Sequence, residues 1–409
     1  MNATNRLRSG IAALLLLGVT GAGAQAASEP YTPADDSVVL ERLAPAANAV
    51  EGLRALQAQR RALAKIPDNL DAAASFARHA IELGRAEADP RYFGYAESAL
   101  APWMTLTDPP PRARLLRATL RQQRHDFAGA LADLDVLIAA NGRDAQARLT
   151  RAVVLMVQGR PADAITDCNA LIEARADLVA SAVCISEARS LDGHADAAIA
   201  TLKSVLAEAG HSIPPSEKVW ALTTLAEIEV RQARQADAET HFREALALLA
   251  ATGERNPYLL TAVADFLLAS GRAREALALT ADSTRVDNLL LRFALAQAAL
   301  GEPAAAESIR LLQARFAEAA LRGATVHLRE EAMFELRLQR NPARALTRAL
   351  QNWESQREPA DARLLFDAAI AAGQPAAAQP VLDWMQRTAI EDPALKALAA
   401  TIGAAGARP

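Results

Sequence analysis

The chain has 409 residues, of which 51% are hydrophobic, 4% aromatic and 22% charged, and its net charge is −4. Ala and Leu, which favour helices, supply most of the apolar half, while the β-branched and aromatic residues that favour strands are scarce. This composition excludes an all-β protein and a disordered chain, and the mild acidity argues against a nucleic-acid partner, which would need a basic face. We therefore expect an all-α protein.

Residues 1–26 are predicted to be a signal peptide. A short n-region with two arginines precedes an apolar run over residues 11–19, and Ala24-Gln25-Ala26 fits an A-x-A cleavage site. We expect cleavage after Ala26, or after Ala27, and export of the mature chain into a bacterial periplasm. The alternative is a cytosolic protein whose first helix is apolar.

The mature chain carries 42 basic and 48 acidic residues, a net charge of −6. No later apolar run approaches the roughly 18 residues that a membrane helix needs, so no span is expected in the mature chain. Residues 27–69 are predicted to form an N-terminal segment and a capping helix, and residues 403–409 a disordered tail. The segment between them, residues 70–402, carries a repeating helical pattern.

Small residues recur in this pattern at intervals near 34. Ala130, Ala164 and Ala198 open similar apolar segments and are each 34 residues apart. Later alanines continue the series at less regular steps: Ala238, Ala276, Ala306, Ala345 and Ala378. Such a period is typical of helical hairpins that bury their apolar faces by stacking, with small residues where two helices cross closely.

The pattern resembles the tetratricopeptide repeat (TPR) family, whose unit is a helix-turn-helix of 34 residues. The family's small residue in the first helix is matched by Ala118, Ala152, Ser186, Ala226, Ala264 and Ala294, and its turn glycine by Gly159, Gly193, Gly271, Gly301 and Gly373. The resemblance implies a right-handed α-α superhelix, a TPR-like solenoid of about nine hairpins, most regular over residues 112–210. The chain departs from the family where His125 and Arg340 replace the turn glycine. It is also similar to exported bacterial repeat proteins through its segment 89–103.

Cys168 and Cys184 are predicted to form a disulfide. They lie at equal distances from the expected turn near residue 176, so they should be level with each other on two antiparallel helices. An oxidising compartment would favour their pairing. The alternative is two small buried thiols.

No catalytic or cofactor motif is visible. The six histidines form no H-E-x-x-H element or similar pair, and there is no phosphate-binding loop, nucleophile elbow or C-x-x-C. We expect no metal site and no cofactor, and a protein that is not an enzyme. His125 and His194 are expected to be solvated residues in turns.

By resemblance to the family, a partner would bind the inner, concave face of the solenoid. Counting from the anchor alanines assigns Arg112, Gln122, Gln146, Glu187, Trp220, Glu227, Tyr258, Asp265, His327 and Arg337 to that face, with Thr119, Thr223, Thr261 and Glu330 at intervening positions. Glu187, Glu227 and Asp265 recur at the same position of three successive units and would form an acidic stripe suited to a basic or polar peptide. The alternative is that Trp220 packs in the core and the acids are merely solvated.

One unit places apolar residues at the inner positions, Leu149, Val153 and Met156. They should be covered, either by the N-terminal segment or by a partner. The favoured function is a non-catalytic periplasmic scaffold that binds a peptide or an envelope protein in its concave groove. Two alternatives are a binder or enzyme acting on a cell-envelope polymer or small ligand, and a solenoid that assembles with copies of itself.

Overall fold

The computed structural model describes residues 49–321 and 327–406, which form α-helices and three short 3₁₀ helices and no strand. The predicted signal peptide, its cleavage site and residues 27–48 lie outside the described residues. The α-helices are α1 (Ala49–Leu63), α2 (Leu70–Glu87), α3 (Arg91–Met104), α4 (Pro111–Gln123), α5 (Phe127–Ala140), α6 (Ala145–Val157), α7 (Pro161–Glu173), α8 (Leu178–Ser190), α9 (Ala195–Ala209), α10 (Pro215–Arg231), α11 (Gln235–Thr252), α12 (Pro257–Ala269), α13 (Ala273–Thr280), α14 (Asp287–Leu300), α15 (Ala305–Leu321), α16 (Leu328–Arg337), α17 (Pro342–Ser355), α18 (Pro359–Ala371), α19 (Gln379–Thr388) and α20 (Pro393–Gly406). The 3₁₀ helices are η1 (Gly210–Ser212), η2 (Ala281–Ser283) and η3 (Pro375–Ala378).

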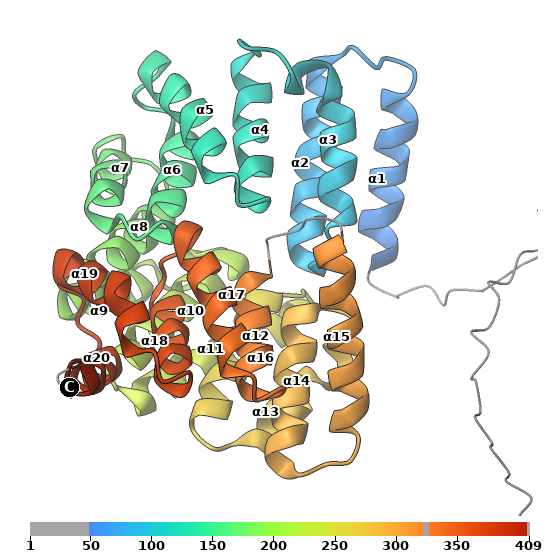
Figure 1. The fold of residues 1–409 in the computed structure, drawn as a ribbon. Helices are drawn as coiled ribbons and strands as arrows, with labels where there is room; N and C mark the ends of the chain where they lie inside the picture. Colours follow the sequence, from blue (N-terminus) through green and yellow to red (C-terminus); the bar gives the residue numbers. More distant parts are fainter. Residues whose placement is uncertain (1–48, 322–326, 407–409) are drawn as a thin grey trace, which may run out of the picture. The chain divides into compact units, whose positions relative to one another are not determined.

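Successive helices pair as hairpins, from α2 with α3 to α18 with α19, and each hairpin packs on its neighbours (Figure 1). Helix α1 packs on α2, and α20 packs on α18. The all-α, TPR-like solenoid predicted from the 34-residue spacing is therefore confirmed. None of the described helices combines the length and the apolarity needed to cross a membrane.

The repeated small residues lie where the helices of a hairpin cross. Ala118, Ala130, Ala152 and Ala164 are completely buried, because only a small side chain lets two backbones approach this closely. The prediction is wrong in the hairpin of α14 and α15, where Ala306 is exposed. Ser308 takes the equivalent position, fourth in its helix, and its hydroxyl donates to Gln297 Oε1 at 2.7 Å. Three consecutive alanines precede Ser308, so the sequence alone does not show which small residue occupies the crossing position.

Local signals explain where the helices begin and end. Asp126 and Asp144 each precede a helix and accept a hydrogen bond from a backbone N–H in its first turn, an arrangement that satisfies groups with no partner inside the helix. Helix α20 continues to Gly406. Residues 403–406, predicted to be disordered, are therefore helical in extension of this last apolar helix, and residues 407–409 lie outside the described residues.

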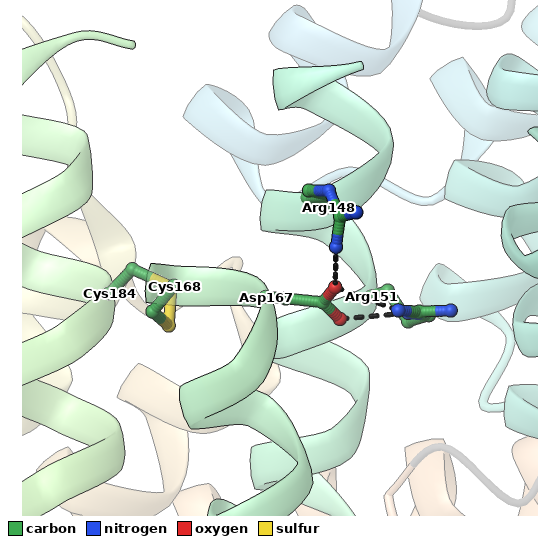
Figure 2. Close-up of a disulfide and its surroundings, with 5 residues drawn as sticks. All are labelled: Arg148, Arg151, Asp167, Cys168 and Cys184. Carbon is green, nitrogen blue, oxygen red and sulfur yellow. Dashed lines mark hydrogen bonds and ion pairs between the residues drawn. A yellow bond between two sulfur atoms is a disulfide. The ribbon is translucent and has the colours of Figure 1, made fainter. Parts of the chain in front are cut away.

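The predicted disulfide between Cys168 on α7 and Cys184 on α8 is present, with Cα atoms 5.5 Å apart (Figure 2). Both cysteines are buried. The bond links the second helix of one hairpin to the first helix of the next, so it ties two repeats together at the point where the chain passes between them.

Replacing both cysteines with alanine is expected to lower the free energy of unfolding by about 3 kcal/mol, because the bond restricts the unfolded chain by closing a short loop. Urea unfolding of the double variant and of the wild-type protein, both without reductant, measures the difference. Adding reductant should destabilise the wild-type protein and leave the variant unchanged. Equal unfolding curves for the two proteins would contradict this account.

Two consecutive hairpins contain the same buried ion cluster. Asp167 is completely buried and accepts hydrogen bonds from Arg148 at 2.8 Å and from Arg151 at 2.7 and 2.8 Å (Figure 2). Asp133, 34 residues earlier, is held in the same way by Arg114 and Arg117 (with Arg121 as a third donor). We call these the arginine–aspartate clamps. Each fixes the second helix of a hairpin to the first.

Candidate functional site

Five of the predicted inner-face residues belong to a group of neighbouring polar side chains: Glu187, Glu227, Tyr258, Asp265 and Glu330. Tyr258, on α12, donates its hydroxyl to Glu227, on α10, with both carboxylate oxygens at 2.9 Å. Glu187, on α8, lies 3.4 Å from Arg231, and Asp265 is held by Arg292 through two hydrogen bonds of 2.8 Å. Two of the three carboxylates of the predicted acidic stripe, Glu187 and Asp265, are therefore paired with arginines.

The pairing residues come from neighbouring first helices. Arg292, on α14, also lies 3.7 Å from Glu330 on α16. Arg329, next to Glu330, binds Asp361 in a bidentate manner at 2.5 and 2.8 Å and contacts Glu358. We call the whole group the inner cluster: Glu187, Glu227, Asp265, Glu330, Glu358, Asp361, Arg231, Arg292, Arg329 and Tyr258.

The inner cluster contains six carboxylates and three guanidinium groups, so negative charge is in excess. Glu227 forms no ion pair with any described residue. Burial, and secondarily the charge of Glu187, raise the pKa of the Glu227 carboxyl to about 8. Burial also raises the pKa of Glu358, against the opposing effect of Arg329. Both shifts come first from burial, which disfavours the charged form of a carboxyl group.

Tyr258 is the exposed aromatic side chain of this cluster. It is 63% exposed, and its ring belongs to no aromatic pair among the described residues. Desolvation of the Tyr258 phenol, followed by the charge of Glu227, raises its pKa well above its ordinary value. The hydroxyl therefore stays protonated and donates to Glu227, which holds the ring in one orientation while leaving its surface available.

Trp220 does not join this group. It is half-buried and packs against the apolar cluster of α8, α9 and α10, which includes Leu225 and Ile228. The prediction that it is a free inner-face anchor is thus replaced by the alternative, a packing role. The contrast with Tyr258 follows from their neighbours, since Trp220 packs on an apolar cluster of α8, α9 and α10, while α10 supplies a carboxylate to Tyr258.

The other predicted residues have local partners. Arg112 pairs with Asp71 at 2.6 Å, and Arg337 pairs with Asp367 at 2.5 Å. Gln146 donates to Thr150 within its own helix, and the ring of His327 lies 6.5 Å from that of Phe316. Gln122 is half-buried and contributes no hydrogen bond to the inner cluster. None of these five residues makes a hydrogen bond or an ion pair with a described residue of the inner cluster.

The apolar inner positions are covered from within the chain. Met156 belongs to a core cluster that also contains Trp353 and Trp384, and Leu149 and Val153 pack against this cluster. The C-terminal helices α17 to α20 thus provide the cover that was expected from the N-terminal segment or from a partner (Figure 1).

The sequence analysis did not identify five residues of the inner cluster: Arg231, Arg292, Arg329, Glu358 and Asp361. Only the first helices were counted, and only at positions transferred from the TPR family, so residues at helix ends such as Arg231 and Glu358 were left out. The described residues contain no group of three or more His, Cys, Asp or Glu arranged to hold a metal ion.

Comparisons with known proteins show what this chain is similar to. No protein-family model matches the sequence, and no curated protein matches it. Among solved structures, the chain is similar to the APC/C hetero-tetramer Cut9–Hcn1, with a TM-score of 0.49 and 15% identity over 87% of this chain and 67% of that one. A Rap protein complexed with competence and sporulation factor gives a TM-score of 0.47 and 15% identity, covering 80% and 96%. A human IFIT1 dimer with m7Gppp-AAAA gives 0.47 and 11%, covering 83% and 86%.

Proposed function

We propose that this protein is a non-catalytic scaffold of the bacterial periplasm that binds a basic segment of a protein partner at the inner cluster. The observation that carries the proposal is the position of Glu227, a carboxylate without an ion pair, beside the exposed ring of Tyr258. A lysine or arginine side chain would stabilise the ionised form of the Glu227 carboxyl and lie against the aromatic ring of Tyr258. The periplasmic location rests on the signal peptide predicted from residues 1–26.

Charge and geometry together favour a basic partner over an acidic one. The three arginines of the inner cluster are already engaged by carboxylates, so an anion would meet no free cation there. Glu227 is the one carboxylate of the inner cluster that forms no ion pair with a described residue, and its charge acts on Tyr258. A cation placed beside Glu227 would stabilise the ionised form of its carboxyl group.

The test is fluorescence anisotropy with a short labelled peptide of alternating lysine and serine, measured above pH 8, where the Glu227 carboxyl is ionised. We expect the wild-type protein to bind it and the Tyr258→Ala variant to bind about tenfold more weakly, since it loses the aromatic contact. Glu254→Gln, which neutralises an exposed acid that is not part of the inner cluster, is the control and should bind like the wild type. Unchanged binding in Tyr258→Ala would contradict the proposal.

Binding should also depend on pH in a defined direction. The pKa of Glu227 is raised to about 8, so its carboxyl is mostly protonated at pH 7 and gains its charge as the pH rises through 8. Lysine side chains keep their charge over this range. Affinity for the lysine peptide should therefore increase across this interval in the wild type, and Glu227→Gln should remove the increase. A wild-type affinity that is independent of pH would exclude Glu227 from the contact.

A further inference from the structure

The C-terminal helices contact a row of turns that lie far away in the sequence. In a solenoid each repeat normally contacts only its neighbours. Here, two loops that follow α17 and α19 reach the turns of four consecutive hairpins between α4 and α11 (Figure 1). We call this contact the seam. Its members are Gln356, Arg357, Trp384, Ala389 and Glu391 on the C-terminal side, and His125, Val157, Gly159, Gly193, Ala195 and Gln232 on the other.

The first half of the seam follows α17. Gln356 Nε2 lies 3.2 Å from Nδ1 of His125, so this histidine is half-buried in the seam and not solvated as the sequence predicts. The next residue, Arg357, donates its backbone N–H to the carbonyl oxygen of Val157 at 2.7 Å. A Cβ atom on Gly159 would lie 2.7 Å from Trp384 Nε1, so the glycine is needed for this close approach as well as for its positive φ of 70°.

The second half follows α19. Ala195, at the start of α9, donates its N–H to Glu391 Oε2 at 3.0 Å. The residue before this helix, His194, provides no side-chain cap, so Glu391 satisfies the helix N-terminus from a distant part of the chain. Gln232 donates to the backbone carbonyl of Glu391, and a Cβ atom on Gly193 would lie 3.1 Å from the carbonyl oxygen of Ala389.

The seam joins the two regions through few backbone contacts and through apolar side chains around Trp353 and Trp384, whereas the helices within each region pack along their lengths. Regions held by few contacts open at lower free energy than the cores they join. The two halves of the seam are carried by one packed group, since α18 packs on both α17 and α20 and their apolar residues share a cluster. Displacing one half should therefore displace the other.

We propose that the seam opens and closes as one unit, which exposes Leu149, Val153 and Met156 when it opens. Glu358 directly follows the seam residues Gln356 and Arg357 and also belongs to the inner cluster, so opening would withdraw this carboxylate from Glu227. The seam would then regulate the inner cluster. That consequence rests on the proposed function, whereas the opening itself does not.

The test is amide hydrogen exchange on the full chain without any ligand, read by mass spectrometry at both ends of the seam. Glu391→Ala removes the acceptor of the Ala195 amide, and we expect about fivefold faster exchange not only there but also at the Arg357 amide, in the other half. Gln356→Ala should have the reciprocal effect on the Ala195 amide, because coupling between two sites is mutual. Core amides such as that of Leu134 should not change in either variant.

Glu254→Ala is the matched control, because it removes an exposed acid outside the seam. It should leave the Ala195 and Arg357 amides at wild-type rates. If each seam variant accelerates exchange only at its own end, the seam is a set of independent contacts and the proposal is overturned. Because no ligand is present, this result is separate from any failure of the lysine peptide to bind.

Discussion

Replacing Asp167 with alanine is expected to lower the free energy of unfolding by about 3–5 kcal/mol, the range found when one partner of a buried ion pair is removed. Asp167 is completely buried, and the side chains of Arg148 and Arg151 are only 16% and 22% exposed. The substitution would leave two guanidinium groups partly desolvated and facing each other without a counter-charge. Urea unfolding of the variant and the wild type measures the difference.

The neighbouring Asp163 provides the control. It is also on α7 and also pairs with an arginine, Arg160, but this pair is exposed on both sides. Asp163→Ala should cost less than about 1 kcal/mol, as is usual for surface ion pairs. Similar losses for Asp163→Ala and Asp167→Ala would show that the arginine–aspartate clamp has no special role in holding the hairpin together.

The clamp could have been found in the sequence. The residues of the second clamp each follow an identical residue of the first by 34 positions: Arg148, Arg151 and Asp167. Identical charged residues at the same repeat position indicate a contact that recurs in both hairpins. The period of the small residues does not indicate these charged residues. The disulfide, by contrast, was predicted because it depends only on antiparallel geometry around one turn, which the spacing of the two cysteines defines.

The repeat register places part of the inner cluster but not its ion pairs. The positions of Glu187, Glu227, Asp265 and Tyr258 follow from counting along the first helices, and the structure brings these four residues together. Their pairing with Arg231 and Arg292 depends on the distance between adjacent helices, which periodicity does not specify. Trp220 shows the same limit, because its packing depends on the apolar side chains that α9 places beside it.

A repeat pattern does not predict the seam. A period near 34 predicts contacts between neighbouring hairpins, and those contacts are present. The contact of Gln356 with His125 joins residues more than 200 positions apart. The one sign of this contact in the sequence is that His125 replaces a turn glycine. Taken alone, this substitution is equally compatible with a solvated turn.

Trp384→Ala should produce the second large effect, a loss of about 3–5 kcal/mol in the free energy of unfolding, as for other large aromatic residues removed from a core. Trp384 is 1% exposed and packs edge-on against Trp353, with ring centroids 5.6 Å apart. Its Nε1 has no hydrogen-bond partner among the described residues, so the loss comes from packing and from the cavity that remains. Urea unfolding of the full chain is the measurement.

The same variant should uncover apolar surface while the protein is still folded, because Trp384 belongs to both the seam and the cluster that covers Met156. Binding of the dye ANS without denaturant should therefore increase in Trp384→Ala. Trp103→Ala is the control, since Trp103 is half-buried against the N-terminal cluster and distant from the seam in the chain. It should cost less stability and leave ANS binding unchanged. An equal rise in ANS binding in both variants would mean that the dye reports general loosening and not exposure of the inner face.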